Sequence, residues 1–255
     1  MTSHLHTFDL DPSIEAAYTG PHLSCGPLPT LFYFSLSAKD SLCLDPFNQP
    51  VAYLSSLPMR IFSITLPGHE NGLPPSEALN LWSQAIMRGE NPIAEFIDKV
   101  NHVVAALQAQ GALIDGRLAI AGLSRGAFLA THCAASNRKF RWILGFAPLT
   151  QPAFAKEFQE INQHPLVESL SLEYLTERLV DREVRFYIGN LDMRVSTRLC
   201  FDFIEKLAQS SKARSPNVEL IIGPSIGRDG HGTAKQVFHE GAQWIAEQLK
   251  VIDVV

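Results

Sequence analysis

Short apolar runs alternate along most of this chain with longer segments in which apolar residues recur at helical spacing. The apolar runs predict strands at residues 31–34, 60–66, 118–121, 141–147, 184–189 and 217–223. The helical spacing predicts helices at residues 47–57, 76–88, 92–110, 127–135, 196–210 and 233–250. Strands that alternate with helices in this way predict an α/β fold, in which helices cover both faces of a mostly parallel sheet.

Two segments fall outside this alternation. Residues 1–30 are rich in proline, glycine and histidine, and we expect them to wrap the outside of the domain. Residues 149–183 have helical character with a less regular period, which is typical of a lid or cap insertion. Asp45, before Pro46, is a candidate cap for the helix at 47–57. A length of 255 residues favours one domain that spans residues 1–255.

Composition narrows the class of protein. Hydrophobic residues make up 46% and charged residues 18%, which is typical of a folded globular chain. A net charge of −5 without a long basic run argues against nucleic acid or an anionic membrane as partner. No apolar run approaches the roughly 20 residues of a membrane span. With no signal-peptide pattern at the start, we expect a cytoplasmic protein. Four widely spaced cysteines indicate reduced thiols rather than disulfides or a zinc site: Cys25, Cys43, Cys133 and Cys200.

The strongest motif is Gly122-Leu123-Ser124-Arg125-Gly126, between a predicted strand and a predicted helix. A strand, a sharp turn carrying a serine and a helix form the context of a nucleophile elbow. The serine must adopt a strained backbone conformation, and side chains at the flanking positions would clash there. Gly122 and Gly126 remove those side chains. The competing interpretation is an ordinary glycine-containing turn, because the pattern also occurs by chance.

Ser124, Asp192 and His231 each lie in a loop that follows a predicted strand. In open α/β sheets, functional residues collect beyond the carboxyl ends of the strands, so these three should meet. Serine is too weak an acid to attack a carbonyl carbon unaided. A histidine must take its proton, and a buried carboxylate must orient that histidine. The sequence therefore predicts a catalytic triad.

Alternatives remain for the acid and the histidines. Asp192 has a second interpretation as a turn or helix-capping residue. Asp229 is a competing acid in the histidine loop, but two residues from His231 it is poorly placed to reach Nδ1 from the opposite side. His132 is expected to pack on the helix after the nucleophile. His69 either lines the pocket or lies at the surface.

The Ser, Asp, His order and its motifs resemble the α/β-hydrolase superfamily over nearly the whole chain. The segments 122–126, 188–192 and 230–232 look like the esterase and prolyl-oligopeptidase-like branch, which includes dienelactone-hydrolase-like proteins. The resemblance implies an α/β-hydrolase fold with a small helical lid. It also implies Ser124 as nucleophile, Asp192 as orienting acid and His231 as general base. Catalysis would proceed through an acyl-enzyme without a metal or organic cofactor.

An oxyanion hole requires two hydrogen-bond donors. One is the backbone N–H of Arg125, directly after the nucleophile. The second should come from the loop after the strand at 31–34, where many family members carry His-Gly. This chain has Ser35-Leu36-Ser37 instead. Because a backbone donor does not depend on its side chain, we predict the amide of Leu36, with Ser37 as the neighbouring option.

These observations predict a serine hydrolase that cleaves a small carboxylic ester or thioester. A peptidase or acyltransferase with the same triad is an alternative within enzymes. A non-catalytic protein that binds a small ligand or a partner in the same pocket is the alternative from another class. The departure in the loop at Ser35 is the feature that favours it.

Some side chains near the motifs have a functional and a structural interpretation. Arg125 and Arg194 suit an anionic substrate group, but pairing with a local acid or exposure to solvent is the favoured interpretation. Apolar side chains near the site are assigned to the core rather than to an acyl pocket. They are Met193, Trp82, Phe154 and Phe158.

Overall fold

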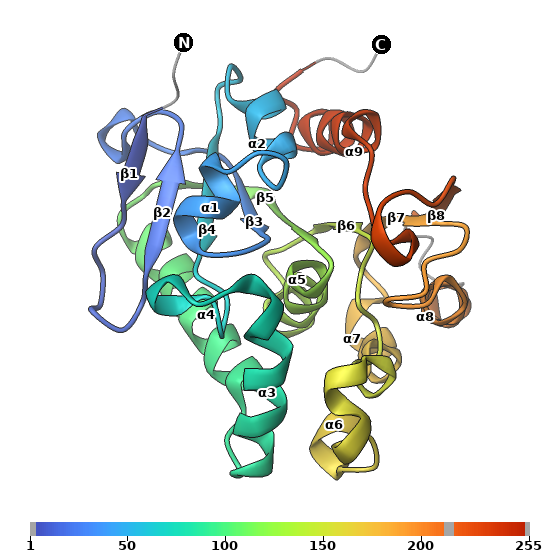
Figure 1. Ribbon diagram of the computed structural model, residues 1–255. Helices are drawn as coiled ribbons and strands as arrows, with labels where there is room; N and C mark the ends of the chain where they lie inside the picture. The colour runs from blue at the N-terminus through green and yellow to red at the C-terminus, as the bar shows by residue number, and fades with distance from the viewer. Residues whose placement is uncertain (1–3, 212–216, 253–255) are drawn as a thin grey trace.

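The computed structural model of the protein describes residues 4–211 and 217–252 (Figure 1). Its centre is an eight-stranded sheet in the order β1-β2-β4-β3-β5-β6-β7-β8. Two antiparallel strands, β1 (Leu5–Thr7) and β2 (Ala16–Thr19), form one edge. The remaining strands are parallel: β3 (Leu28–Phe34), β4 (Arg60–Ile64), β5 (Leu113–Leu123), β6 (Trp142–Phe146), β7 (Glu183–Gly189) and β8 (Val218–Gly223).

All the strands predicted from apolar runs are present. The expectation that residues 1–30 only wrap the domain is wrong, because β1, β2 and the first part of β3 belong to the sheet. These strands are short, and β2 is held by pairing with β4, far along the chain. β5 begins before the predicted residue 118, where its side chains are partly or fully exposed. Neither the short edge strands nor the exposed first residues of β5 form a long apolar run in the sequence.

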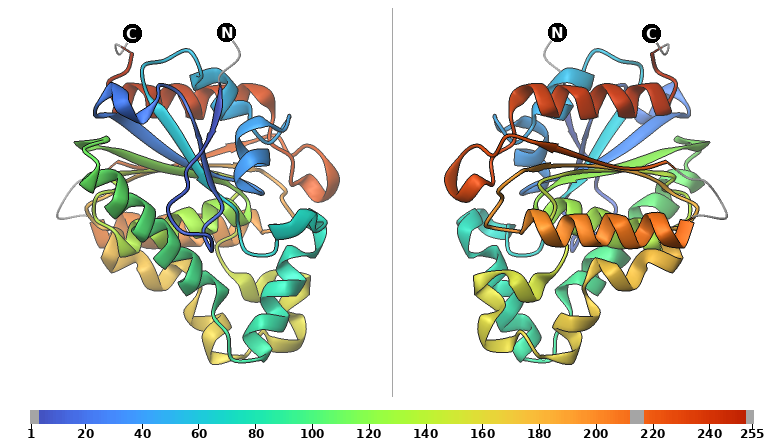
Figure 2. Two further views of the ribbon diagram at one scale, coloured as in Figure 1. Left: turned by 90° about the vertical axis from the view of Figure 1, so that its left-hand side faces the viewer. Right: turned by 90° about the vertical axis from the view of Figure 1, so that its right-hand side faces the viewer.

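Helices cover both faces of the sheet, as predicted, and Figure 2 shows the two layers. On one face lie α1 (Ala38–Cys43), α2 (Gln49–Leu54) and α9 (Lys235–Gln248). On the other lie α3 (Ala78–Met87), α4 (Pro92–Ala109), α5 (Arg125–Ser136) and α8 (Thr197–Ser211). Each layer buries its own apolar cluster against the sheet. The sheet is therefore shielded from solvent over most of its area.

Two local details differ from the prediction. The N-cap of α2 is Asn48, without a side-chain capping bond, so Asp45 is not its cap. The Asp45 carboxylate instead accepts a hydrogen bond from the Gln49 side chain. The short helix α1 was not predicted. Ser37 caps it by accepting from the backbone N–H of Asp40 at 3.1 Å.

Residues 149–183 connect β6 to β7 through short helical pieces, which explains their irregular period. These pieces are η4 (Pro152–Phe154), η5 (Lys156–Ile161), α6 (Pro165–Ser169), η6 (Leu172–Leu175) and α7 (Thr176–Leu179). η5 contacts α3, while η6 and α7 contact α5 and α8. Figure 1 shows α3 and α6 at the same end of the molecule. The segment is thus helical as predicted, and its action as a lid stays a prediction.

Candidate active site

The predicted nucleophile lies in a sharp turn between β5 and α5. Ser124 has φ 55° and ψ −116°, a strained conformation for a residue with a side chain. A Cβ atom on Gly122 would lie 2.3 Å from the carbonyl carbon of Gly126, and one on Gly126 would lie 2.1 Å from the Phe34 carbonyl oxygen. The two glycines are therefore needed for the close approach. The Ser124 N–H donates to the Phe146 carbonyl at 2.8 Å, which holds the turn against β6.

The predicted serine, histidine and aspartate meet at the carboxyl ends of β5, β7 and β8. Ser124 Oγ lies 2.9 Å from His231 Nε2, and His231 Nδ1 lies 2.7 Å from Asp192 Oδ2. An ionised carboxylate only accepts hydrogen bonds, so the Nδ1 atom must carry the proton. Nε2 is then left as an acceptor for the serine hydroxyl. This is the tautomer that a general base requires.

The surroundings of Asp192 hold its carboxylate in place. Its side chain is 0% exposed. Oδ1 accepts from the backbone N–H of Arg194 at 2.9 Å and of Val195 at 3.1 Å. Oδ1 therefore stabilises the turn, as the second interpretation of Asp192 expected, while Oδ2 binds the histidine. One carboxylate serves both purposes.

The histidine loop packs tightly on the loop that carries the acid. Gly230 has φ 71°, and a Cβ there would lie 2.1 Å from the Leu191 carbonyl oxygen. The Met193 N–H donates to the Asp229 carbonyl at 2.9 Å. The Asp229 side chain is 52% exposed and pairs with Arg228 at 3.7 Å. Among the described residues its carboxylate makes no hydrogen bond or ion pair with His231, whose Nδ1 lies against Asp192 instead.

The two predicted oxyanion donors have different surroundings. Arg125 begins α5, where backbone N–H groups lack intrahelical acceptors. Leu36 lies at the cavity wall, but its N–H donates to Ser41 Oγ at 2.9 Å. The Ser35 N–H also donates to this hydroxyl, at 3.1 Å. Leu36 as second donor stays a prediction, and it requires the amide to leave or share Ser41.

A cavity of about 580 Å³ opens at the triad. Its walls come from the loop after β3, from α3 and from the segment after β6. Met193 and Phe154 line it and are 60% and 42% exposed, so their assignment to the core is wrong. Trp82 and Phe158 are buried in the core, as predicted. Phe154 and Phe158 lie in the same segment after β6, so no signal in the sequence separates the exposed from the buried side chain.

The two arginines at the cavity differ in their partners. Arg194 makes two hydrogen bonds with the Glu157 carboxylate, at 2.9 and 3.0 Å, which confirms local pairing. Arg125 is partly buried, and among the described residues no carboxylate lies within 4.0 Å of its guanidinium. Burial, and secondarily the positive charge of Arg194, lowers the pKa of Arg125 to about 10. In the described part of the chain, the Arg125 guanidinium is therefore neither paired with a local acid nor fully exposed to solvent, the two states expected from the sequence.

Two histidines near the site are buried and neutral. His69 is 5% exposed, and its Nε2 has no hydrogen-bond partner within the described part of the chain. Burial, with the charge of Arg125 nearby, lowers the pKa of His69 to about 3. His132 donates from Nε2 to the Leu170 carbonyl at 2.9 Å and stacks edge-on against Phe128, as the packing prediction expected. Burial lowers its pKa to about 4.

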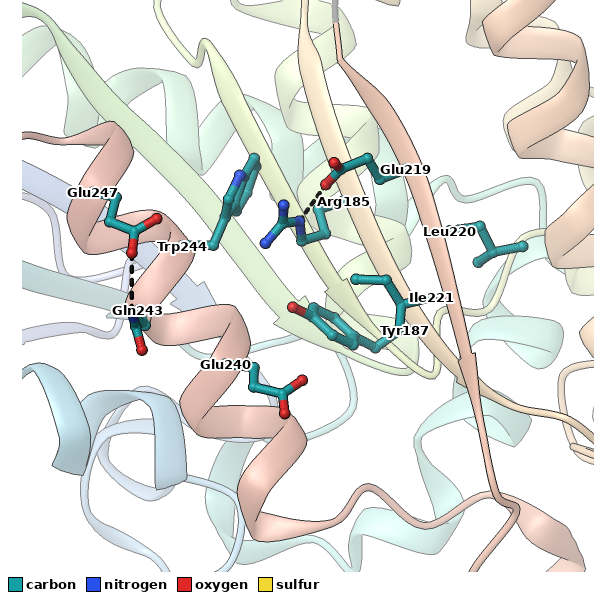
Figure 3. A pocket seen from close by; sticks show the side chains of 9 residues that line it. All are labelled: Arg185, Tyr187, Glu219, Leu220, Ile221, Glu240, Gln243, Trp244 and Glu247. Atoms are coloured by element: carbon teal, nitrogen blue, oxygen red, sulfur yellow. Dashed lines mark hydrogen bonds and ion pairs between the residues drawn. The ribbon is translucent and has the colours of Figure 1, made fainter. Parts of the chain in front are cut away.

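A second cavity, of about 570 Å³, lies between β7, β8 and α9 (Figure 3). Arg185 pairs there with Glu219, and its guanidinium lies 4.9 Å from the ring centre of Trp244. No serine or histidine lines this cavity. Within the described residues there is also no group of histidine, cysteine or acidic side chains placed to hold a metal. No described helix has the length and apolar character needed to cross a membrane.

Neither a protein-family model nor a curated protein sequence matches this chain. Solved structures do match. Prolyl oligopeptidase B from Galerina marginata has a TM-score of 0.70 and 15% identity, covering 97% of this chain and 36% of that chain. A cold-adapted esterase from an Arctic intertidal metagenomic library has a TM-score of 0.67 and 14% identity, covering 96% and 92%. S-formylglutathione hydrolase (FrmB) from Staphylococcus aureus has a TM-score of 0.63 and 14% identity, covering 96% and 98%.

These likenesses confirm the α/β-hydrolase fold that the sequence resemblance implied. The neighbours include prolyl-oligopeptidase-like proteins and esterases, as the motifs indicated. The chain spans little more than a third of the length of the peptidases that it matches. It spans nearly all of the esterase and of the S-formylglutathione hydrolase. A shared fold at such low identity leaves the reaction to be argued from the site.

Proposed function

We propose that this protein is a serine hydrolase that cleaves an ester or thioester of a small carboxylic acid through an acyl-enzyme. The observation that carries the proposal is the continuous chain of hydrogen bonds from Ser124 through His231 to Asp192 at the mouth of a cavity. An esterase and an S-formylglutathione hydrolase among the fold neighbours support it. The cavity volume suits a small molecule.

In the first half of the proposed reaction, Ser124 Oγ attacks the carbonyl carbon while His231 Nε2 accepts the hydroxyl proton. The buried Asp192 carboxylate stabilises the imidazolium that forms. Negative charge develops on the carbonyl oxygen, and the N–H of Arg125 at the start of α5 donates to it. The imidazolium then gives its proton to the leaving alcohol or thiol, and the acyl group stays on Ser124.

In the second half, water takes the place of the leaving group. His231 Nε2 accepts a proton from the water, whose oxygen attacks the acyl carbon. The tetrahedral intermediate collapses to a free carboxylic acid, and the proton returns to Ser124 Oγ. A peptidase or an acyltransferase would use the same residues with another leaving group or acceptor, so substrate screening should include amides and competing alcohols.

One observation favours a different class of function. Because the Leu36 amide is engaged by Ser41, the second oxyanion donor is occupied in this structure. A protein with an incomplete oxyanion hole would bind a small ligand without turning it over. This second candidate predicts ligand affinity without hydrolysis.

Intact-protein mass after incubation with a fluorophosphonate tests the proposal. We expect a single adduct on the wild type and none on Ser124→Ala. Ser76→Ala is a matched control, because Ser76 lines the same cavity without a histidine partner, and this variant should still be labelled. A folded wild type that forms no adduct and hydrolyses no short acyl ester would contradict the serine hydrolase and favour the binding protein.

A further inference from the structure

We propose that the side chain of Arg125 binds an anionic group, a carboxylate or its equivalent, which the substrate carries close to its scissile bond. The inference rests on the proposed function, because it names the substrate class for the same site. Arg125 would then have two separate roles. Its backbone N–H faces the oxyanion, and its guanidinium selects the substrate.

Arg125 differs from the other covered arginines in its partners. Arg60 is 0% exposed and donates to the carbonyls of Pro21, His22, Gly26 and Ala112, at distances from 2.8 to 3.0 Å. Arg194, beside Arg125, holds both oxygens of Glu157. Arg125 has no such partner among the described residues. Arg182, 2% exposed, also has a counter-charge in Asp181, although two of its nitrogens lack hydrogen-bond partners in the described part of the chain. The fold thus gives these other covered arginines a carboxylate or carbonyl partner and leaves Arg125 open at the nucleophile.

The cavity at Ser124 carries an excess of positive charge, although the whole chain is acidic. The whole chain carries −5. The cavity is nevertheless lined by four basic and two acidic side chains: Arg125, Lys156, Arg194, Arg228, Glu157 and Asp229. Arg194 pairs with Glu157 and Arg228 with Asp229, so the excess positive charge comes from Arg125 and Lys156. A concave site with an excess of one sign of charge attracts ligands of the opposite sign.

The neighbours of Arg125 cannot supply the missing anion. Glu157 is the nearby acid, and its charge offsets a small part of that of Arg125, but both its oxygens are bound by Arg194 and its side chain is only 5% exposed. His69 lies close enough for the charge of Arg125 to disfavour its protonation. A positive charge that is partly buried lowers the stability of the fold unless a negative charge lies close to it. A bound substrate is the remaining source of that counter-charge within the site.

The chemistry of the guanidinium defines the ligand. Its planar fork donates two parallel hydrogen bonds to a carboxylate, which gives orientation as well as affinity. At neutral pH the group keeps its charge, because burial lowers its pKa only to about 10. The anion can sit on the acyl side, as in a monoester of a dicarboxylic acid, or on the leaving-group side, as in an ester of a hydroxy acid. Both share one requirement, a carboxylate near the ester.

Matched pairs of esters test the inference and separate these two sources. Monoethyl glutarate against ethyl pentanoate places a carboxylate on the acyl side in exchange for a methyl group. The butanoyl ester of 3-hydroxypropanoate against propyl butanoate does the same on the leaving-group side. Acid release in a pH-stat gives kcat/KM for each ester. We expect the wild type to prefer one anionic ester over its neutral match by about tenfold or more.

Variants connect that preference to Arg125. In Arg125→Met the ratio of anionic to neutral kcat/KM should fall by about tenfold, and Arg125→Lys should restore part of it. Arg198→Met is the matched control, because it removes the same charge from α8, where Arg198 is 77% exposed and pairs with Asp202. Its ratio should stay within about twofold of the wild type, since exposed charges are screened. Denaturation midpoints show whether each variant is folded.

Equal rates for both members of each pair would overturn the inference, as would a preference that survives in Arg125→Met. Failure of the proposed function gives a different result, in which neither neutral nor anionic esters are hydrolysed and no fluorophosphonate adduct forms. The anion site is then tested without turnover, by calorimetric titration of Ser124→Ala with monoethyl glutarate. If monoethyl glutarate binds to Ser124→Ala but not to the double variant that also carries Arg125→Met, the anion site is supported. If it does not bind to Ser124→Ala, the anion site is overturned.

Discussion

Two cavities of nearly equal size, about 580 and 570 Å³, differ in how far their polar groups are satisfied. In the cavity beside β8, Arg185 is paired with Glu219 and stacked against Trp244 (Figure 3). In the cavity at Ser124, this serine is held in a strained conformation, and Arg125 lacks a paired carboxylate in the described part of the chain.

The difference shows what marks a functional site in this protein. Volume does not separate the two cavities, but backbone strain and a partly buried arginine without a paired carboxylate among the described residues do. Both cost free energy of folding, and they persist only where the surrounding structure imposes them. In the cavity beside β8 the one arginine is paired with Glu219, and the other two acids, Glu240 and Glu247, accept hydrogen bonds from glutamine side chains of α9. The three predictions that follow test this contrast.

The largest expected effect is on the acid of the triad. Asp192→Asn should lower kcat by about 10⁴-fold, because an amide cannot favour the histidine tautomer that accepts the serine proton. The measurement is turnover of a short acyl ester. Asp229→Asn is the matched control in the adjacent loop, and its activity should stay within a fewfold of the wild type. Equal losses in both variants would refute the assignment of the acid.

The next effect is on stability against pH. Because His69 is neutral in the folded protein, with a pKa of about 3 against 6.5, its contribution is fully present above pH 6.5. The contribution is lost as pH falls below 6.5, where the unfolded chain takes up the proton. Between pH 7 and pH 5 this amounts to about 2 kcal/mol of unfolding free energy.

Urea denaturation at both pH values measures this loss. In His69→Gln the drop between pH 7 and pH 5 should be smaller by about 2 kcal/mol. His102→Gln changes an exposed histidine on α4 and serves as the control, with the same drop as the wild type. Identical pH dependence in His69→Gln and the wild type would mean that His69 is not held neutral by burial.

The smallest effect is expected in the cavity beside β8. Arg185→Met removes a partly exposed ion pair and a cation–π contact, so the free energy of unfolding should fall by about 1 kcal/mol or less. Fluorophosphonate labelling should be unchanged. A loss of labelling would show that this cavity communicates with the triad, and the contrast between the two cavities would then be wrong.

The sequence alone determined the sheet and the three residues at its strand ends. Parallel strands joined by helices bring their carboxyl ends to one edge, so Ser124, Asp192 and His231 followed from their positions after apolar runs. The antiparallel edge was not predictable in this way, because β1 and β2 are short and depend on pairing with β4.

Only the tertiary structure decided which groups are paired. Arg125 and Arg194 have the same predicted roles in the sequence, yet Glu157, from another segment, pairs with Arg194 and not with Arg125. Ser41 in the same way engages the Leu36 amide, and only the structure shows that Met193 and Phe154 are exposed at the cavity. Hydrogen-bond and ion-pair partners are fixed by distances of a few ångströms between segments far apart in the chain. The spacing of apolar residues along the chain does not predict such distances.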